Sequence, residues 1–185
     1  MYILETDKFD IITHINQAWR DFALDNQGDH LLNGRNVINT SIWDHITDPG
    51  TRHIYRLVVK HVREHGGKSL IPFRCDSPDS LRFMEMEIEL LANSGIRYTS
   101  TLIREEHRRP VPFFWFIEES SSTEQVLTVC SWCKKIQNDR AEFVEIEHAV
   151  RQMRLLEANT VPPISHGMCP TCWTEYADKF LAALV

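Results

Sequence analysis

Four cysteines form two pairs in the carboxy-terminal third of the chain, and each pair has the spacing Cys-x-x-Cys. Cys130 and Cys133 make the first pair, Cys169 and Cys172 make the second, and residues 134–168 lie between them. One turn of chain with this spacing can place two sulfur atoms at neighbouring corners of a tetrahedron, and thiolates are the ligands that a structural Zn²⁺ ion prefers. The two pairs therefore predict one zinc site per chain.

The neighbouring residues leave two questions about this site open. His166 lies three residues before Cys169 and offers either an alternative metal ligand or a hydrogen bond that orients a thiolate. A thiol-based redox sensor or oxidoreductase is the alternative to zinc, because Cys169 and Cys172 lie at the expected start of a helix, where the helix dipole favours thiolates. We favour zinc held by the four cysteines, since no strand-helix-strand unit surrounds a single pair as it does in thioredoxin-like enzymes.

Composition narrows the classes of function. The 185 residues carry a net charge of −6, and neither half of the chain has an excess of Lys and Arg. Direct nucleic-acid binding is therefore disfavoured, although a zinc-ribbon DNA-binding regulator remains a second alternative. The longest apolar run, residues 111–117, is far shorter than the roughly 20 residues of a membrane span, and no signal-peptide pattern is present. We expect a cytoplasmic protein that does not enter the membrane.

The first 108 residues alternate between helical and strand-like periodicity, which predicts an α+β fold. Apolar residues at helical spacing and capping residues predict three helices, at 17–26, 41–46 and 48–66. Methionine and isoleucine alternate with glutamate in RFMEMEIEL, which is typical of a half-buried strand. Together with its neighbours in the sequence this strand forms an antiparallel meander, with segments at 69–76, 82–90 and 96–105.

These segments together resemble a PAS sensor domain over residues 1–108. The resemblance is carried by HINQAWRDFA, by GRNVINTSIWDHI, by the helix at 48–66 and by the hairpin RCDSP...RFMEMEI. It implies a five-stranded antiparallel sheet with flanking helices around a small cavity, which holds a ligand or is filled by side chains. We expect any ligand to be small and apolar. The candidate lining residues are Trp19, Phe22, Trp43, Phe73, Cys75, Met84, Met86 and Tyr98.

Two prolines and a run of serines predict a linker at residues 109–125, followed by a cysteine-rich zinc-binding module at 126–185. The module resembles the short cysteine-rich tails that follow PAS or receiver domains in bacterial signalling proteins. We expect it to be zinc-ribbon-like and helical, with one helix capped by Asn138 or Asp139 and a second beginning near Cys169.

The combined features predict a signal-sensing regulatory protein and not an enzyme. In this hypothesis the zinc module mediates dimerisation or binds an unknown protein partner. We expect a homodimer because two segments offer more apolar surface than a soluble monomer usually exposes. These are PVPFFWFI and the helical stripe of Trp173, Tyr176, Phe180 and Leu184.

Overall fold

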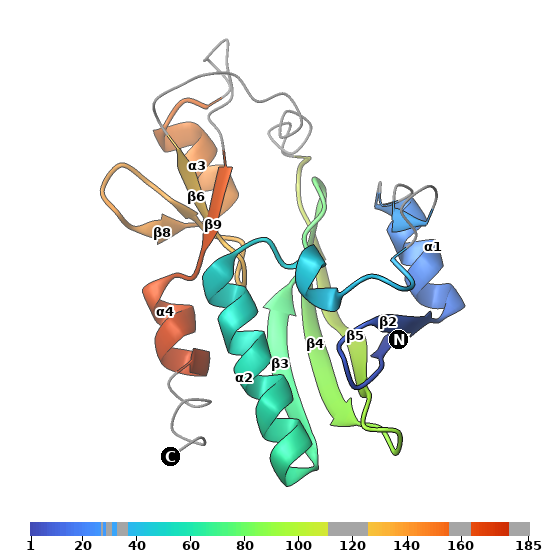
Figure 1. The fold of residues 1–185 in the computed structure, drawn as a ribbon. Coiled ribbons are helices and arrows are strands. Elements are labelled where there is room, and N and C mark those ends of the chain that lie inside the picture. The colour runs from blue at the N-terminus through green and yellow to red at the C-terminus, as the bar shows by residue number, and fades with distance from the viewer. Residues whose placement is uncertain (27, 29–30, 33–36, 111–125, 156–163, 178–185) are drawn as a thin grey trace.

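The computed structural model describes the chain except for residues 27, 29–30, 33–36, 111–125, 156–163 and 178–185. It has an α+β fold with two sheets (Figure 1), one antiparallel and five-stranded, the other small and mixed. Most of the predicted linker, residues 111–125, lies outside the described residues. None of the helices in the described part is long and apolar enough to cross a membrane.

The larger sheet has the strand order β2-β1-β5-β4-β3, and every neighbouring pair is antiparallel. Its strands are β1 Tyr2–Thr6, β2 Ile12–Ile15, β3 Lys68–Arg74, β4 Ser80–Leu90 and β5 Ile96–His107. The five-stranded antiparallel sheet implied by the resemblance to PAS domains is thus confirmed. The three-strand meander of β3, β4 and β5 is also confirmed, and it leaves β3 at one edge of the sheet.

Three helices flank this sheet, and each begins after a side chain that caps its free N–H groups. The helices are α1 Gln17–Asp25, the 3₁₀ helix η2 Ile42–His45 and α2 Pro49–His65. Asn16, Ser41 and Asp48 accept hydrogen bonds from backbone N–H groups of the first turns. Gly66, with φ of 71°, ends α2 in a conformation that favours glycine. The helices predicted at 17–26, 41–46 and 48–66 are therefore confirmed.

Helix α2 covers the inner face of the sheet (Figure 1) and forms the main core with it. Its apolar stripe packs on one face of β4, in which Met84 and Ile88 are buried. Glu87 and Glu89 lie on the opposite face and bind Lys68 of β3. The alternation predicted for RFMEMEIEL is confirmed, because successive side chains of a strand point to opposite faces.

The smaller sheet has the order β8-β7-β6-β9, and the two cysteine pairs lie at the ends of its strands β6 and β9 or shortly after them. Strands β6 and β9 are parallel, and the other two pairings are antiparallel. The strands are β6 Leu127–Cys130, β7 Ile136–Gln137, β8 Phe143–Val144 and β9 Ile164–Gly167. Three short helical elements accompany them: α3 Ile146–Gln152, α4 Pro170–Cys172 and the π-helical η4 Trp173–Ala177.

The expectation of a zinc-ribbon-like helical module is confirmed only in part, since its described residues form a four-stranded mixed sheet as well as short helices. Asn138 does not cap a helix. Its side chain accepts hydrogen bonds from the N–H groups of Arg140 and Glu142, which closes the turn between β7 and β8. Phe143 then pairs with Gln137 as strand, and α3 begins only after Glu145. The expected start of the last helix is confirmed, because Cys169 caps α4 and Pro170 is its first residue.

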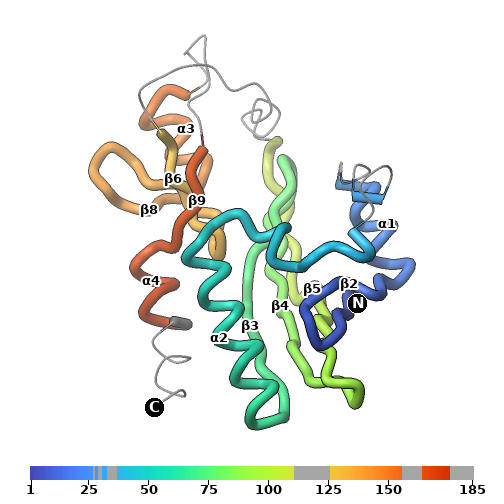
Figure 2. The backbone as a smooth tube through the Cα atoms, viewed as in Figure 1, coloured from blue at the N-terminus to red at the C-terminus, as the bar shows by residue number. Residues whose placement is uncertain are grey.

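The two units meet beside the edge strand β3, where the beginning of α2 lies near the small sheet (Figure 2). The backbone N–H of Arg74, at the end of β3, donates to the carbonyl of Trp132 at 2.9 Å. The guanidinium group of Arg74 binds Asp76 and also Glu145 of the second unit. Arg108 makes a second ion pair across the junction, with Glu147 at 2.8 Å. Hydrogen bonds, buried charges and apolar contacts therefore hold the units together.

Candidate metal centre

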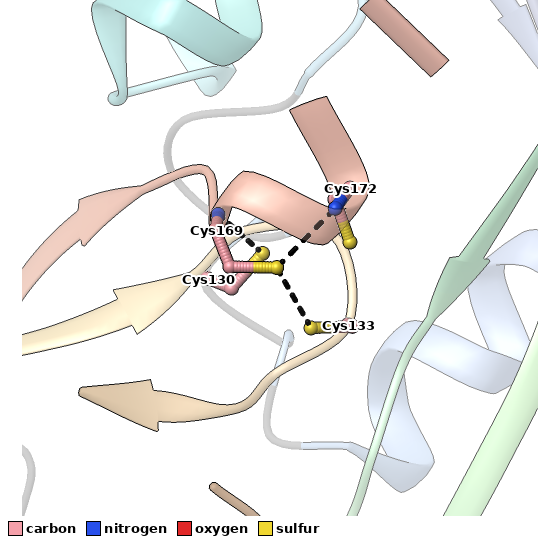
Figure 3. Close-up of side chains that lie close together, drawn as sticks. All are labelled: Cys130, Cys133, Cys169 and Cys172. Atoms are coloured by element: carbon pink, nitrogen blue, oxygen red, sulfur yellow. Dashed lines mark hydrogen bonds between the residues drawn. The ribbon is translucent and has the colours of Figure 1, made fainter. Parts of the chain in front are cut away.

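The two cysteine pairs meet in one cluster (Figure 3), in which all four Sγ atoms lie within 4.8 Å of one another. The sulfur atoms of Cys133 and Cys169 are 3.8 Å apart. A tetrahedral zinc ion with Zn–S bonds of about 2.3 Å separates its sulfur ligands by about 3.8 Å, whereas a disulfide brings them to about 2.05 Å. All four cysteines are free thiols in the structure. Their spacing therefore matches a site that can bind a metal ion such as zinc.

A tight turn between β6 and β7 positions the first pair. The N–H of Cys130 donates to the carbonyl of Lys135 at 2.8 Å, and the N–H of Lys134 donates to the carbonyl of Cys130 at 3.0 Å. Lys134 has φ of 61°, the left-handed conformation that allows the chain to reverse within a few residues. We call residues 130–135 the cysteine turn. It directs the sulfur atoms of Cys130 and Cys133 toward the second pair (Figure 3).

Parallel pairing of β6 with β9 brings the second pair to the first. In this register Cys130 lies opposite Gly167, two residues before Cys169. The N–H of Cys169 donates to the Cys130 sulfur at 3.3 Å, and the N–H of Cys172 donates to the Cys169 sulfur at 3.4 Å. Backbone N–H groups thus face two of the four sulfur atoms, an arrangement that favours thiolates.

The clustered thiols shift one another's pKa values. Hydrogen bonds from Cys133 and Cys172, and from backbone N–H groups, lower the pKa of Cys130. Hydrogen bonding to the Cys130 sulfur raises the pKa of Cys133 and of Cys172, because both keep the protons that they donate. Without metal the cluster therefore holds a thiolate bonded to protonated neighbours. A bound cation would displace those protons, so that metal affinity depends on pH.

His166, the alternative metal ligand, and the fifth cysteine, Cys75, lie outside the cluster. His166 is exposed on β9. In the described part of the chain, its ring does not belong to the cluster of ligand atoms that the four cysteines form. Cys75 is partly buried, and burial raises the pKa of its thiol. The structure thus gathers the four paired cysteines and leaves out both other residues.

A cavity of about 210 Å³ lies between the inner face of the larger sheet and the helices η2 and α2. Four of the predicted residues line it, namely Trp19, Trp43, Met86 and Tyr98. The rest of the wall is mainly apolar, and it includes Tyr55 of α2, which the sequence indicated only as part of an apolar stripe. The Tyr98 hydroxyl is buried and has no hydrogen-bond partner among the described residues.

The other four residues predicted for this cavity are not among its lining residues. Phe73 and Met84 pair across β3 and β4 near the second unit, where they line a separate groove of about 270 Å³ beside the cysteines. Phe22 packs on the ring of Tyr2 with ring centroids 4.6 Å apart. Cys75 follows β3 and lines neither space. Strand alternation places residues on the correct face, but their position along the strand decides which space they line.

Comparison of the sequence with protein-family models gives no match, and comparison with curated proteins gives none either. The cysteine cluster and the cavity are therefore the features that bear on function. Membership of the PAS family stays a hypothesis.

Proposed function

We propose that the chain is a signal-sensing regulatory protein without enzymatic activity, in which a PAS-like domain is coupled to a structural zinc module. One observation supports this most strongly. Four cysteine sulfur atoms gather at tetrahedral spacing within the same hydrophobic core that the larger sheet forms with α2. Four protein ligands complete the coordination of zinc, which leaves no position open for a substrate, and such sites are structural rather than catalytic.

The second unit has the features of a module that needs a metal ion for its stability. Strands β7 and β8 have two residues each, and the separate apolar cluster of this unit contains only a few buried residues. Small units of this kind gain stability from a metal ion that cross-links distant parts of the chain. Zinc suits the four soft thiolates, and iron is another metal ion that a tetrahedral set of four sulfur atoms accepts.

The cavity supports the sensory part of the proposal. It is mostly apolar, and its lining residues include the polar side chains of His45 and Ser100. The cavity therefore suits a small, mainly apolar molecule.

Two observations favour this function over the alternatives from the sequence. Cys130, Cys169 and Cys172 are buried, whereas a thiol that exchanges with a substrate needs access to it. The cations of α2 are engaged within the chain: Arg63 binds Asp10 at 2.6 Å, and Arg52 donates to a backbone carbonyl. Such contacts argue against a phosphate-binding surface on this helix. A redox enzyme and a DNA-binding regulator are therefore the less favoured hypotheses.

The dimer or partner interface stays a proposal. Trp173, directly after Cys172, is 43% exposed and is the described part of the predicted apolar stripe. The rest of that stripe and residues 111–117 fall outside the described side chains. We expect the zinc module to present this surface to a second copy of the chain or to another protein.

Metal analysis tests the central claim. Freshly purified, reduced protein should contain one zinc ion per chain by elemental analysis. Cys130→Ser and Cys172→Ser should each lose the metal and lower the melting temperature, because the metal stabilises only the folded state. Cys75→Ser is the matched control and should keep both. Purified protein without metal, or an equal loss of metal in the control variant, would contradict the proposal. Native mass spectrometry of the same sample would also detect any small molecule bound in the cavity.

A further inference from the structure

Trp132 lies between two of the cysteine ligands and reaches into the core of the other unit. It belongs to the cysteine turn, directly before Cys133, and its side chain is only 3% exposed. Its ring stacks on the ring of Tyr55 in α2, with ring centroids 5.6 Å apart and an angle of 28° between the planes. The turn that positions two sulfur atoms therefore also positions a large ring against α2.

Tyr55 is in turn part of the cavity wall. The Tyr55 side chain lines the cavity together with Trp43 and Tyr98, so the same residue contacts both Trp132 and this space. Its neighbours in α2, Ile54 and Val58, are buried in the core and hold the helix against the sheet. The cysteine cluster and the cavity are thus joined through two packed aromatic rings.

We propose that Trp132 couples the cysteine cluster to the cavity, so that metal binding and filling of the cavity favour each other. This inference rests on the proposed function, which assigns zinc to the cluster and a small ligand to the cavity. Metal bonds to Cys130 and Cys133 restrain the cysteine turn at both sides of Trp132, and their loss gives the ring freedom to leave Tyr55. Tyr55 then loses a packing partner, and the cavity loses a fixed wall.

The junction between the units makes this effect local. Arg74 binds Glu145 and Arg108 binds Glu147, and both glutamates flank the start of α3 rather than the cysteine cluster. None of these four residues belongs to the group of metal ligands. We therefore expect the second unit to stay docked when the metal is removed, while the cysteine turn and the adjoining part of α2 change.

Fluorobenzene is a suitable probe, because it is small and apolar and its ¹⁹F signal reports binding. Its affinity should be at least about fivefold lower for the chelated, reduced wild-type protein than for the zinc-loaded protein. By reciprocity, saturating fluorobenzene should raise the zinc affinity by the same factor. Trp132→Leu keeps all four cysteines and should still bind zinc. In this variant, however, the zinc-loaded and the chelated protein should bind fluorobenzene with equal affinity.

Trp173→Leu is the matched control, because Trp173 also adjoins a cysteine ligand but is 43% exposed, whereas Trp132 is buried. This variant should keep the wild-type ratio between the fluorobenzene affinities of the zinc-loaded and the chelated protein. Hydrogen exchange gives a second measurement that needs no variant: removing the metal should speed exchange of the amides around Tyr55, while β4 and β5 stay protected. This measurement decides the question if Trp132→Leu does not fold.

The outcomes separate this coupling from the function on which it rests. Equal fluorobenzene affinities for the zinc-loaded and chelated wild-type protein would overturn the coupling and leave both sites intact. Absence of fluorobenzene binding to either form would refute the ligand-binding role of the cavity, and the coupling with it. Loss of protection across β4 and β5 on chelation would mean global unfolding, which would overturn the local route through Trp132.

Discussion

Replacing Arg74 by methionine should destabilise the protein far more than neutralising its partner Glu145. Arg74 joins the two units, since its guanidinium group binds Asp76 beside it and Glu145 at 2.9 Å in the second unit. The two acidic partners differ in environment: the Asp76 side chain is 3% exposed, whereas that of Glu145 is 37% exposed. The variant Arg74→Met therefore leaves a buried carboxylate without its main partner.

The burial of each partner sets the expected magnitude. Removing one member of a buried ion pair costs about 3 to 5 kcal/mol, because the remaining charge is desolvated and uncompensated. Arg108 lies 3.9 Å from Asp76 and replaces part of the lost interaction. We therefore expect Arg74→Met to lower the free energy of unfolding by about 3 kcal/mol, the lower end of that range. Glu145→Gln removes a partly exposed pair and should cost less than about 1 kcal/mol.

Urea unfolding of the zinc-saturated variants, followed by far-UV circular dichroism, measures both losses. A further variant identifies the cause: Asp76→Asn added to Arg74→Met should recover at least about half of the lost stability, since it removes the orphaned charge. If Arg74→Met and Glu145→Gln prove equally stable, or if Asp76→Asn recovers nothing, the buried charge is not what makes Arg74 important.

Four other outcomes follow from the sites. Zinc affinity should rise with pH by at least about a hundredfold per unit near neutrality, because Cys133 and Cys172 each release a proton on binding. Chelator competition measures this rise, and a flat profile would contradict it. Trp43→Ala should cost about 3 to 5 kcal/mol in urea unfolding, because it empties a buried site; a loss below about 1 kcal/mol would show that Trp43 gates the cavity. Tyr98→Phe removes a buried hydroxyl that has no hydrogen-bond partner among the described residues. In the same assay, the ligand-free variant should be as stable as the wild type or about 1 kcal/mol more stable. Clear destabilisation would show that the hydroxyl has a hydrogen-bond partner. Light scattering at micromolar concentration should give the mass of a dimer, and a monomer mass would place the apolar stripe against its own chain.

Local chemistry in the sequence determined most of the helices and strands. Asn16, Ser41 and Asp48 cap the helices that were expected to follow them, because a capping side chain bonds N–H groups only two or three residues away. The alternation in β4 separated its buried face from its glutamate face for the same local reason. The spacing within each cysteine pair likewise indicated a metal site, since both ligands of a pair lie in one turn of chain. Asn138 is the instructive exception, because its side chain closes a turn as readily as it caps a helix.

Only the tertiary structure decided which of these features meet. The parallel register of β6 and β9 brings Cys169 to Cys130 and leaves His166 exposed, and no local pattern specifies that register. Position along the sheet placed Met86 at the cavity and Met84 at the groove beside the cysteines, although the two residues share one strand face. The stacking of Trp132 on Tyr55 joins residues far apart in the chain. Such contacts depend on how whole sheets and helices pack, so they follow from long-range complementarity of shape and charge rather than from the spacing of residues along the chain.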